Sequence, residues 1–162
     1  KGVMTITLHS DRLTDLGLTQ SSVYVARFLG DKVSEENELP ISAILLPDFS
    51  NLSQTELERA PLIRLSAEEV DMRLTLAKKQ KAKQNITVTN EGRTPLEISK
   101  LQVFHPAVGV ALKKRVLQPG ESTRLRVTVD RRHVSKSRRP LRLLMITNDP
   151  QHPKKEINIL AK

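Results

Sequence analysis

Residues 117–130 read LQPGESTRLRVTVD, a tight turn followed by a segment in which polar and aliphatic residues alternate. Pro119 and Gly120 occupy the central positions of a type II turn, which needs a φ of about −60° at the first and a positive φ at the second. In the segment 124–129 the aliphatic residues would face a core while the two arginines face water. The stretch therefore predicts a half-buried strand that begins at a turn, which is typical of antiparallel sheets.

The same alternation recurs along the chain. In the segment Asn85–Thr89, Ile86 and Val88 would share one face and the threonines the other. Further candidate strands are short aliphatic runs bounded by turn residues: Leu62–Leu65, Val70–Leu76, Leu96–Phe104, Val108–Leu112, Leu141–Ile146 and Glu156–Leu160. Short strands at spacings of about 8 to 15 residues predict an all-β antiparallel β-sandwich and not βαβ units.

Helix signals are few. Ser53–Glu56 has the spacing of a capping box, and Pro61 would stop any helix that follows, so we interpret residues 50–60 as a linker with one helical turn. Ser66–Glu69 has the same spacing. A short helix there therefore competes with a strand that begins at Val70.

Charge is distributed unevenly along the chain, whose formal net charge is +9. Residues 1–60 hold five Lys and Arg against nine Asp and Glu, whereas residues 61–162 hold 22 against nine. The net charges are therefore −4 and +13, and a break of this size predicts a boundary near residue 60.

Three segments of the first part of the chain resemble segments of the second part. The paired segments are Thr5–Leu8 with Arg126–Val129, Val23–Ala26 with Leu141–Leu144, and Pro40–Leu45 with Glu156–Leu160. An internal repeat of this kind predicts tandem domains, with residues 1–49 as the C-terminal part of a truncated first domain. Its open edge would pack on the second domain or pair with another chain, because unpaired sheet edges are liabilities. An ordinary small hairpin layer is the alternative.

Four motifs of residues 61–162 carry a family resemblance: ITVTNEGRTPLEISKLQV (Ile86–Val103), LQPGES (Leu117–Ser122), RLRVTVD (Arg124–Asp130) and ITNDPQHP (Ile146–Pro153). They resemble a bacterial domain of unknown function made of Hydin-like, immunoglobulin-type repeats, often in tandem in exported proteins of Gram-negative bacteria. The resemblance implies an immunoglobulin-like antiparallel β-sandwich at residues 61–162, preceded by the back half of a similar domain. It also implies a periplasmic or cell-surface location.

One departure from that family concerns cysteine. Family members often carry Cys-Gly-Cys where this chain has Val108-Gly109-Val110, and the chain contains no cysteine at all. Any metal or redox role of those cysteines is therefore excluded, as are disulfides and thiol nucleophiles.

Catalytic motifs are missing from the sequence. It has no Gly-x-Ser-x-Gly elbow, no phosphate-binding glycine loop and no His-Glu-x-x-His. His9, His105, His133 and His152 lack metal-ligand spacing, and we interpret them as exposed loop residues. We therefore predict no enzyme activity, no metal and no cofactor. No apolar run approaches the length needed to span a bilayer.

Basic clusters are the main candidates for a binding site. The loop between two strands at residues 131–139 holds five cations, and residues 113–115 and 78–83 form two more clusters. The candidate polyanion-binding residues are Lys113, Lys114, Arg115, Arg131, Arg132, Lys136, Arg138 and Arg139. The ligand would be an anionic glycan, a lipid head group or a nucleic acid; nucleic acid is disfavoured because Phe104 is the only aromatic residue of the basic part.

Two other interpretations of the cations stay open, a solvated surface or a surface that docks the acidic first part. We expect a non-enzymatic structural or protein-interaction module of a bacterial cell-envelope protein. Its partner would be a protein or a neighbouring domain. Polyanion binding through the loop at 131–139 is the alternative function.

Overall fold

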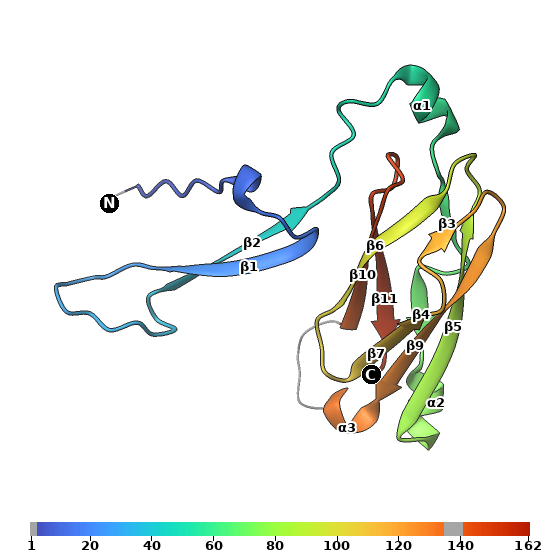
Figure 1. The fold of residues 1–162 in the computed structure, drawn as a ribbon. Coiled ribbons are helices and arrows are strands. Elements are labelled where there is room, and N and C mark those ends of the chain that lie inside the picture. The colour runs from blue at the N-terminus through green and yellow to red at the C-terminus, as the bar shows by residue number, and fades with distance from the viewer. Residues whose placement is uncertain (1–2, 135–140) are drawn as a thin grey trace. The chain divides into compact units, whose positions relative to one another are not determined.

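The computed structural model describes residues 3–134 and 141–162 of the 162-residue chain. The chain divides into two compact units, residues 1–45 and residues 46–162. Figure 1 shows the elements of each unit along the chain.

The first unit is a two-stranded antiparallel hairpin. A single 3₁₀ turn, η1 (Ser10–Arg12), precedes β1 (Gly17–Tyr24), which pairs with β2 (Glu38–Leu45) along its whole length. The match of Thr5–Leu8 to Arg126–Val129 implies a strand, but these residues form no regular structure and no described strand pairs with them. The segment Val23–Ala26 lies at the end of β1, which stops at Tyr24.

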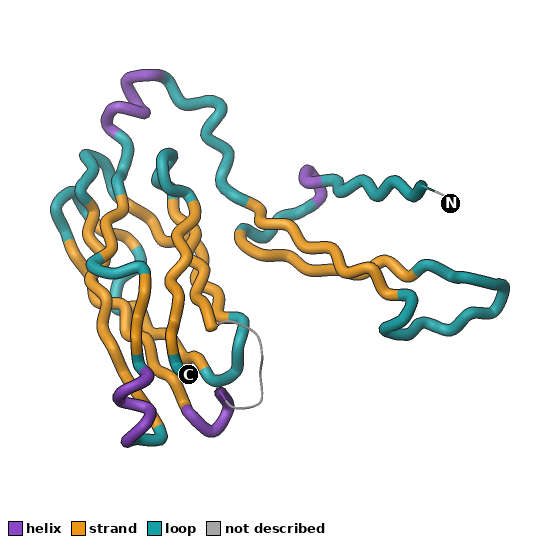
Figure 2. The backbone as a smooth tube through the Cα atoms, turned by 180° about the vertical axis from the view of Figure 1, so that it is seen from behind, coloured by secondary structure: helices purple, strands orange, loops and turns teal. Residues whose placement is uncertain are grey.

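The second unit is a sandwich of two sheets. Its elements are α1 (Gln54–Arg59), β3 (Ile63–Leu65), β4 (Glu69–Asp71), α2 (Arg73–Lys78), β5 (Lys81–Asn90), β6 (Leu96–Val103), β7 (Val108–Leu112), β8 (Val116–Leu117), β9 (Ser122–Asp130), α3 (Arg131–Val134), β10 (Leu141–Thr147) and β11 (Lys154–Leu160). One sheet has the order β3-β5-β9-β7 and the other β4-β11-β10-β6-β8. Figure 2 shows α1 at one end of this unit and α2 and α3 at the other. The predicted all-β sandwich is confirmed.

Alternation along the strands sends aliphatic side chains into the core. Leu125, Val127 and Val129 on β9 are fully buried, and so are Ile86 and Val88 on the neighbouring β5, as the sequence predicted. Each such side chain contributes roughly 1.5–3 kcal/mol when it leaves water. The buried hydrophobic residues of the described chain are all aliphatic or methionine.

The local motifs form as their sequences predict. Gly120 has a φ of 77° and the Glu121 amide donates to the Gln118 carbonyl over 2.9 Å, which confirms the type II turn. The Ser53 hydroxyl accepts from the Glu56 amide, and the Glu56 carboxylate accepts from the Ser53 amide. This reciprocal capping box begins α1.

The strand predicted over Val70–Leu76 is half wrong. Its first part forms β4, but α2 replaces the rest, and the competing helix at Ser66–Glu69 does not form. The apolar residues at 70 and 72 fit a strand, while those at 72 and 76 fit one helical face. The bond from the Leu76 amide to the Met72 carbonyl shows that the helical spacing prevails after residue 72.

Candidate functional site

Asn90 organises the end of the sandwich where the linker joins it. The side chain is fully buried, and its Oδ1 accepts from the amides of Leu62 over 3.4 Å and Gly92 over 3.0 Å. Its Nδ2 donates to the carbonyls of Thr94 over 2.8 Å and Leu117 over 3.0 Å. One buried amide therefore connects the linker, its own turn and β8, and each of its polar atoms has a partner.

Gly92 lets the linker lie directly against this turn. A Cβ at Gly92 would lie 2.4 Å from both the Ala60 oxygen and the Leu62 nitrogen, and 2.5 Å from the Pro61 Cα. The Glu91 amide also donates to the Leu62 carbonyl over 2.8 Å. A side chain at position 92 would therefore push the linker off the turn.

Asp149, in the β10–β11 turn of the other sheet, holds Ile63, the first residue of β3. Its carboxylate is fully buried and accepts from the Ile63 amide over 2.9 Å. It also accepts from the amides of Gln151 over 2.9 Å and His152 over 3.2 Å. The His152 Nδ1 lies 3.3 Å from the same carboxylate. We call Asn90, Gly92 and Asp149, with residues 60–63 that follow the linker into β3, the linker clamp.

The residues before Asp149 fasten the β10–β11 turn to β6. The Asn148 Oδ1 accepts from the Glu97 amide over 2.7 Å, and its Nδ2 donates to the Pro95 carbonyl over 3.1 Å. The Thr147 hydroxyl donates to the His152 carbonyl over 3.2 Å. The Asn-x-Gly and Thr-Asn-Asp-Pro motifs thus act as structural ties at one end of the sandwich.

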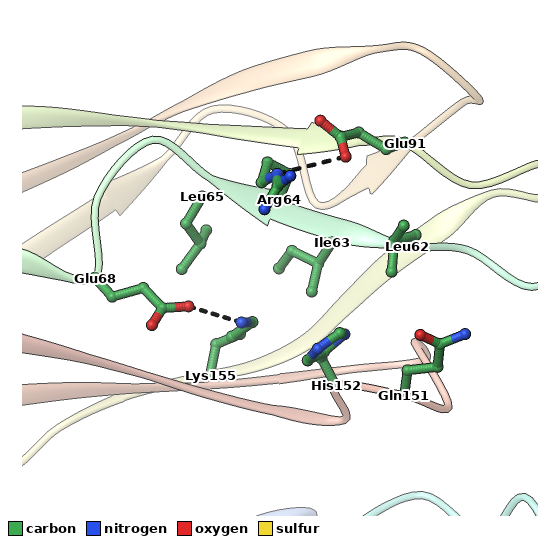
Figure 3. Close-up of a pocket in the computed structure, with 9 residues that line it drawn as sticks. All are labelled: Leu62, Ile63, Arg64, Leu65, Glu68, Glu91, Gln151, His152 and Lys155. Carbon is green, nitrogen blue, oxygen red and sulfur yellow. Dashed lines mark hydrogen bonds and ion pairs between the residues drawn. The ribbon is translucent and has the colours of Figure 1, made fainter.

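A cleft of about 480 Å³ opens beside the clamp, between β3 and the β10–β11 turn (Figure 3). Lys155 and Glu68 form an ion pair of 2.7 Å there, and this pair lowers the pKa of the Glu68 carboxyl. Residues of both signs and three aliphatic residues line the cleft: Leu62, Ile63, Arg64, Leu65, Glu68, Glu91, Gln151, His152 and Lys155. Because the charges are mixed and two ion pairs already join them, the cleft favours no single class of ion.

The predicted basic residues do not gather at one place. Residues 113–115 follow β7 beside the Ser122 end of β9, whereas Arg131 and Arg132 follow its other end at Asp130. A nine-residue strand separates the two groups by about 30 Å. The structure instead brings Arg131 to the cluster at 78–83, since its amide donates to the Gln80 carbonyl over 2.8 Å.

The cluster at 113–115 is partly engaged within the domain. Lys114 pairs with the Glu121 carboxylate at 2.5 Å, and this bond lowers the pKa of the Glu121 carboxyl. Arg115 donates to the Ile98 carbonyl over 3.4 Å. Lys113 is exposed and has no hydrogen bond or ion pair within the described chain.

The other predicted cluster is engaged more fully. Arg132 binds both carboxylate oxygens of Asp130, at 3.1 and 2.7 Å, and this holds the pKa of that carboxyl well below its usual range. Arg131 donates to the Leu76 carbonyl over 3.2 Å. The remaining candidates, Lys136, Arg138 and Arg139, lie outside the described residues.

Sequence reasoning missed a basic groove on the outer face of the four-stranded sheet. Arg124 and Arg126 of β9 and Lys113 and Lys114 of the β7–β8 loop line a shallow depression of about 850 Å³. The alternation of β9 placed the arginines in water but could not show which strand lies beside them. We call these four cations the basic groove.

The histidines are not all exposed, which corrects the sequence interpretation. His105 is buried, and its Nδ1 accepts from the Ala107 amide over 3.0 Å, so its imidazole is part of the β6–β7 turn. In the described part of the chain, no three His, Asp or Glu side chains are grouped to hold a metal ion. None of the helices there has the length and apolar character to cross a membrane.

Comparison with known families adds to this geometry. A family model described as the HYDIN/CFA65/VesB-like, Ig-like domain matches residues 61–162. It confirms the predicted resemblance to Hydin-like repeats and the predicted immunoglobulin-like fold. A search of curated proteins finds no match.

One solved structure supports the fold. A protein of unknown function from Porphyromonas gingivalis W83 is similar with a TM-score of 0.70 and 23% identity, over 93% of this chain and 68% of that chain. The secreted serine protease VesC from Vibrio cholerae matches with a TM-score of 0.42 and 14% identity, over 76% of this chain and 26% of its own. The first likeness shows the fold alone, and the second carries no weight.

Proposed function

The chain belongs to the HYDIN/CFA65/VesB-like Ig-like domain family, and we propose that it serves as a non-enzymatic structural module of a bacterial cell-envelope protein, in the periplasm or at the cell surface. In this role the sandwich would connect neighbouring parts of an exported protein and resist tension between them. It would also offer its surface to a protein partner. The family supports a structural or interaction role, and the strand arrangement supports resistance to tension.

The observation that carries this proposal is the parallel pairing of the first and last strands of one sheet. β4 runs parallel to β11, with Val70 opposite Ile159. The Met72 amide donates to the Leu160 carbonyl over 2.8 Å, and the Asn158 amide donates to the Glu68 carbonyl over 2.9 Å. The first strand of this sheet in chain order and the last strand of the domain are therefore bonded side by side.

The parallel pairing of β4 and β11 determines how the domain resists a pulling force. When the two segments are pulled apart along the strand direction, the parallel strands slide against each other and all their hydrogen bonds are loaded together. If the strands were peeled from one end, each bond of about 1 kcal/mol would break in turn. The linker clamp adds to the resistance because it ties residues 60–63 to both sheets.

Pulling single molecules in two directions tests the proposal. In the first, handles are attached to Arg59→Cys and to a cysteine appended after Lys162, so that the force passes through the linker clamp and β3 to β4, which then slides against β11. In the second, they are attached to Lys79→Cys and to the same appended cysteine, so that β11 peels. The chain contains no cysteine of its own, so each attachment is unique.

We expect a clearly higher unfolding force in the first direction than in the second at the same loading rate. Equal forces in the two directions would contradict a role in bearing tension. Both variants should keep the unfolding free energy of the parent in urea, since both substituted residues are exposed.

Polyanion binding through the loop at 131–139 has less support than the structural role. Of its described cations, Arg131 is bonded to the Leu76 carbonyl and Arg132 to Asp130. A polyanion would have to compete with the Asp130 carboxylate for Arg132. We therefore do not advance this function.

A further inference from the structure

The strand β7 forms one edge of the four-stranded sheet. It pairs with β9 on one side, and no described strand pairs with its other side. With five residues it is the longest edge strand of the sandwich as described, since β3 and β4 have three residues each and β8 has two.

The register of β7 shows which of its backbone groups face outward. The Asp130 amide donates to the Ala107 carbonyl over 2.9 Å, just outside the pair of Val108 and Val129. In an antiparallel ladder, that arrangement makes Val108 a non-hydrogen-bonded position, and the bonded positions alternate from Gly109 onward. The three non-bonded positions, Val108, Val110 and Leu112, therefore turn backbone groups away from β9.

Val110 and Leu112 are the last two of these non-bonded positions. Their side chains pack against the core, while their N–H and C=O groups point to the open side of the sheet. The strand itself contains no charged residue and no proline, the devices that usually block an edge. The backbone of β7 is therefore ready to pair with a further strand.

The basic groove lies alongside this edge. Arg126 stands opposite Ala111 of β7 in the ladder, and Lys113 directly follows the strand. Arg124 and Arg126 are exposed, and no carboxylate of the described residues pairs with either. Lys114 of the groove is already paired with Glu121. A strand added to β7 would thus run beside three positive charges that no described carboxylate compensates, those of Arg124, Arg126 and Lys113.

We propose that β7 is a strand-addition site for an extended acidic segment of a partner protein. Backbone bonds to Val110 and Leu112 would hold the segment, and acidic side chains on its outer face would meet the basic groove. Pairing of β7 with β7 of a second copy would bring two basic grooves together, and this repulsion opposes self-association. The charge therefore selects an acidic partner over another copy of the chain.

This site goes beyond the structural role proposed above and does not depend on it. The pulling experiment compares two directions of force on β4 and β11, and the pairing of β7 is not what it measures. Failure of either experiment therefore leaves the other proposal standing.

The first test measures binding of a defined probe. A fluorescent, capped peptide of alternating glutamate and valine is titrated with the full chain, and anisotropy is recorded. Arg124→Glu with Arg126→Glu should weaken binding by about tenfold or more, because two attractive charges become repulsive. The matched control, Lys78→Glu with Lys79→Glu, makes the same charge change at the other end of the domain and should bind like the wild type.

The second test asks whether the backbone of β7 takes part. Hydrogen exchange is followed by NMR, with and without saturating peptide. Without peptide, the amides of Val110 and Leu112 should exchange faster than those of Gly109 and Ala111, which bond to β9. With peptide, exchange at Val110 and Leu112 should slow markedly.

A third probe separates strand addition from general anion binding. It is an acidic peptide of equal charge in which proline replaces valine, so that it cannot form a ladder. Much weaker binding of this peptide supports the proposal. Equal binding of both peptides, no slowing at Val110 and Leu112, or equal loss in the control variant would each overturn it.

Discussion

Replacing Gly92 with alanine is expected to destabilise the second unit by about 3 kcal/mol, because the added Cβ has no space. It would lie 2.4 Å from the Ala60 oxygen and the Leu62 nitrogen, well inside van der Waals contact. These neighbours are backbone atoms, which cannot rotate away as a flexible side chain could. The linker or the turn must therefore shift, and bonds of the clamp are lost.

Urea unfolding measures this effect against a matched control. Gly109→Ala makes the same chemical change in β7, where a Cβ meets nothing within 4 Å and the backbone has no positive φ. That variant should stay within about 0.5 kcal/mol of the wild type. If Gly92→Ala proved equally harmless, the close packing of the linker against the turn would be refuted.

Asn90→Ala is expected to lower the unfolding free energy of the second unit by about 4 kcal/mol. The substitution removes four hydrogen bonds, of which the one to the Leu117 carbonyl is buried. Each unsatisfied buried group costs about 1–3 kcal/mol, and partial access of water to the others limits the sum.

Asn85→Ala is the control for this substitution, since Asn85 lies on the same strand but faces water. Its unfolding free energy should change by about 0.5 kcal/mol at most. Asn90→Asp adds a further comparison. It keeps the acceptor for Leu62 and Gly92 but loses both donors and buries a charge, so it should also destabilise. A stable Asn90→Ala variant would show that Asn90 does not tie the clamp together.

Local patterns explain how much of the fold could be predicted. The strand β9 and the turn before it follow from adjacent residues, because alternation and the Pro119–Gly120 pair are local signals. The boundary between β4 and α2 could not be predicted from the sequence, because Met72 fits both the period of a strand and the period of a helix. β8 is too short to give any periodicity.

The clamp could not be predicted, because its contacts join distant parts of the chain. Asn90 and Asp149 lie in turns, and nothing in the sequence around them indicates that Asn90 accepts the Leu62 amide or that Asp149 accepts the Ile63 amide. Asp149 and Ile63 are 86 residues apart, and no local pattern reports a bond of that separation. The feature that identifies both is the full burial of a polar turn residue, which is visible only in the structure.

The basic surfaces show the same limit. The sequence placed Arg124 and Arg126 in water correctly, but only the strand order brings Lys113 and Lys114 beside them. Conversely, residues 113–115 and Arg131 stand together among the candidate polyanion-binding residues, whereas β9 separates them in the structure. Charge counts therefore locate cations along the chain but not on a surface.

Native-state hydrogen exchange tests most directly whether the linker and the last strand are fastened to the core. The informative amides are those of Ile63, Met72 and Asn158, which bond to Asp149, to the Leu160 carbonyl and to the Glu68 carbonyl. We predict that all three exchange only by global unfolding, with the same free energy and urea dependence as the ladder amides between β5 and β9. Exchange by local opening, at a much lower free energy than that ladder, would contradict a module built to bear tension.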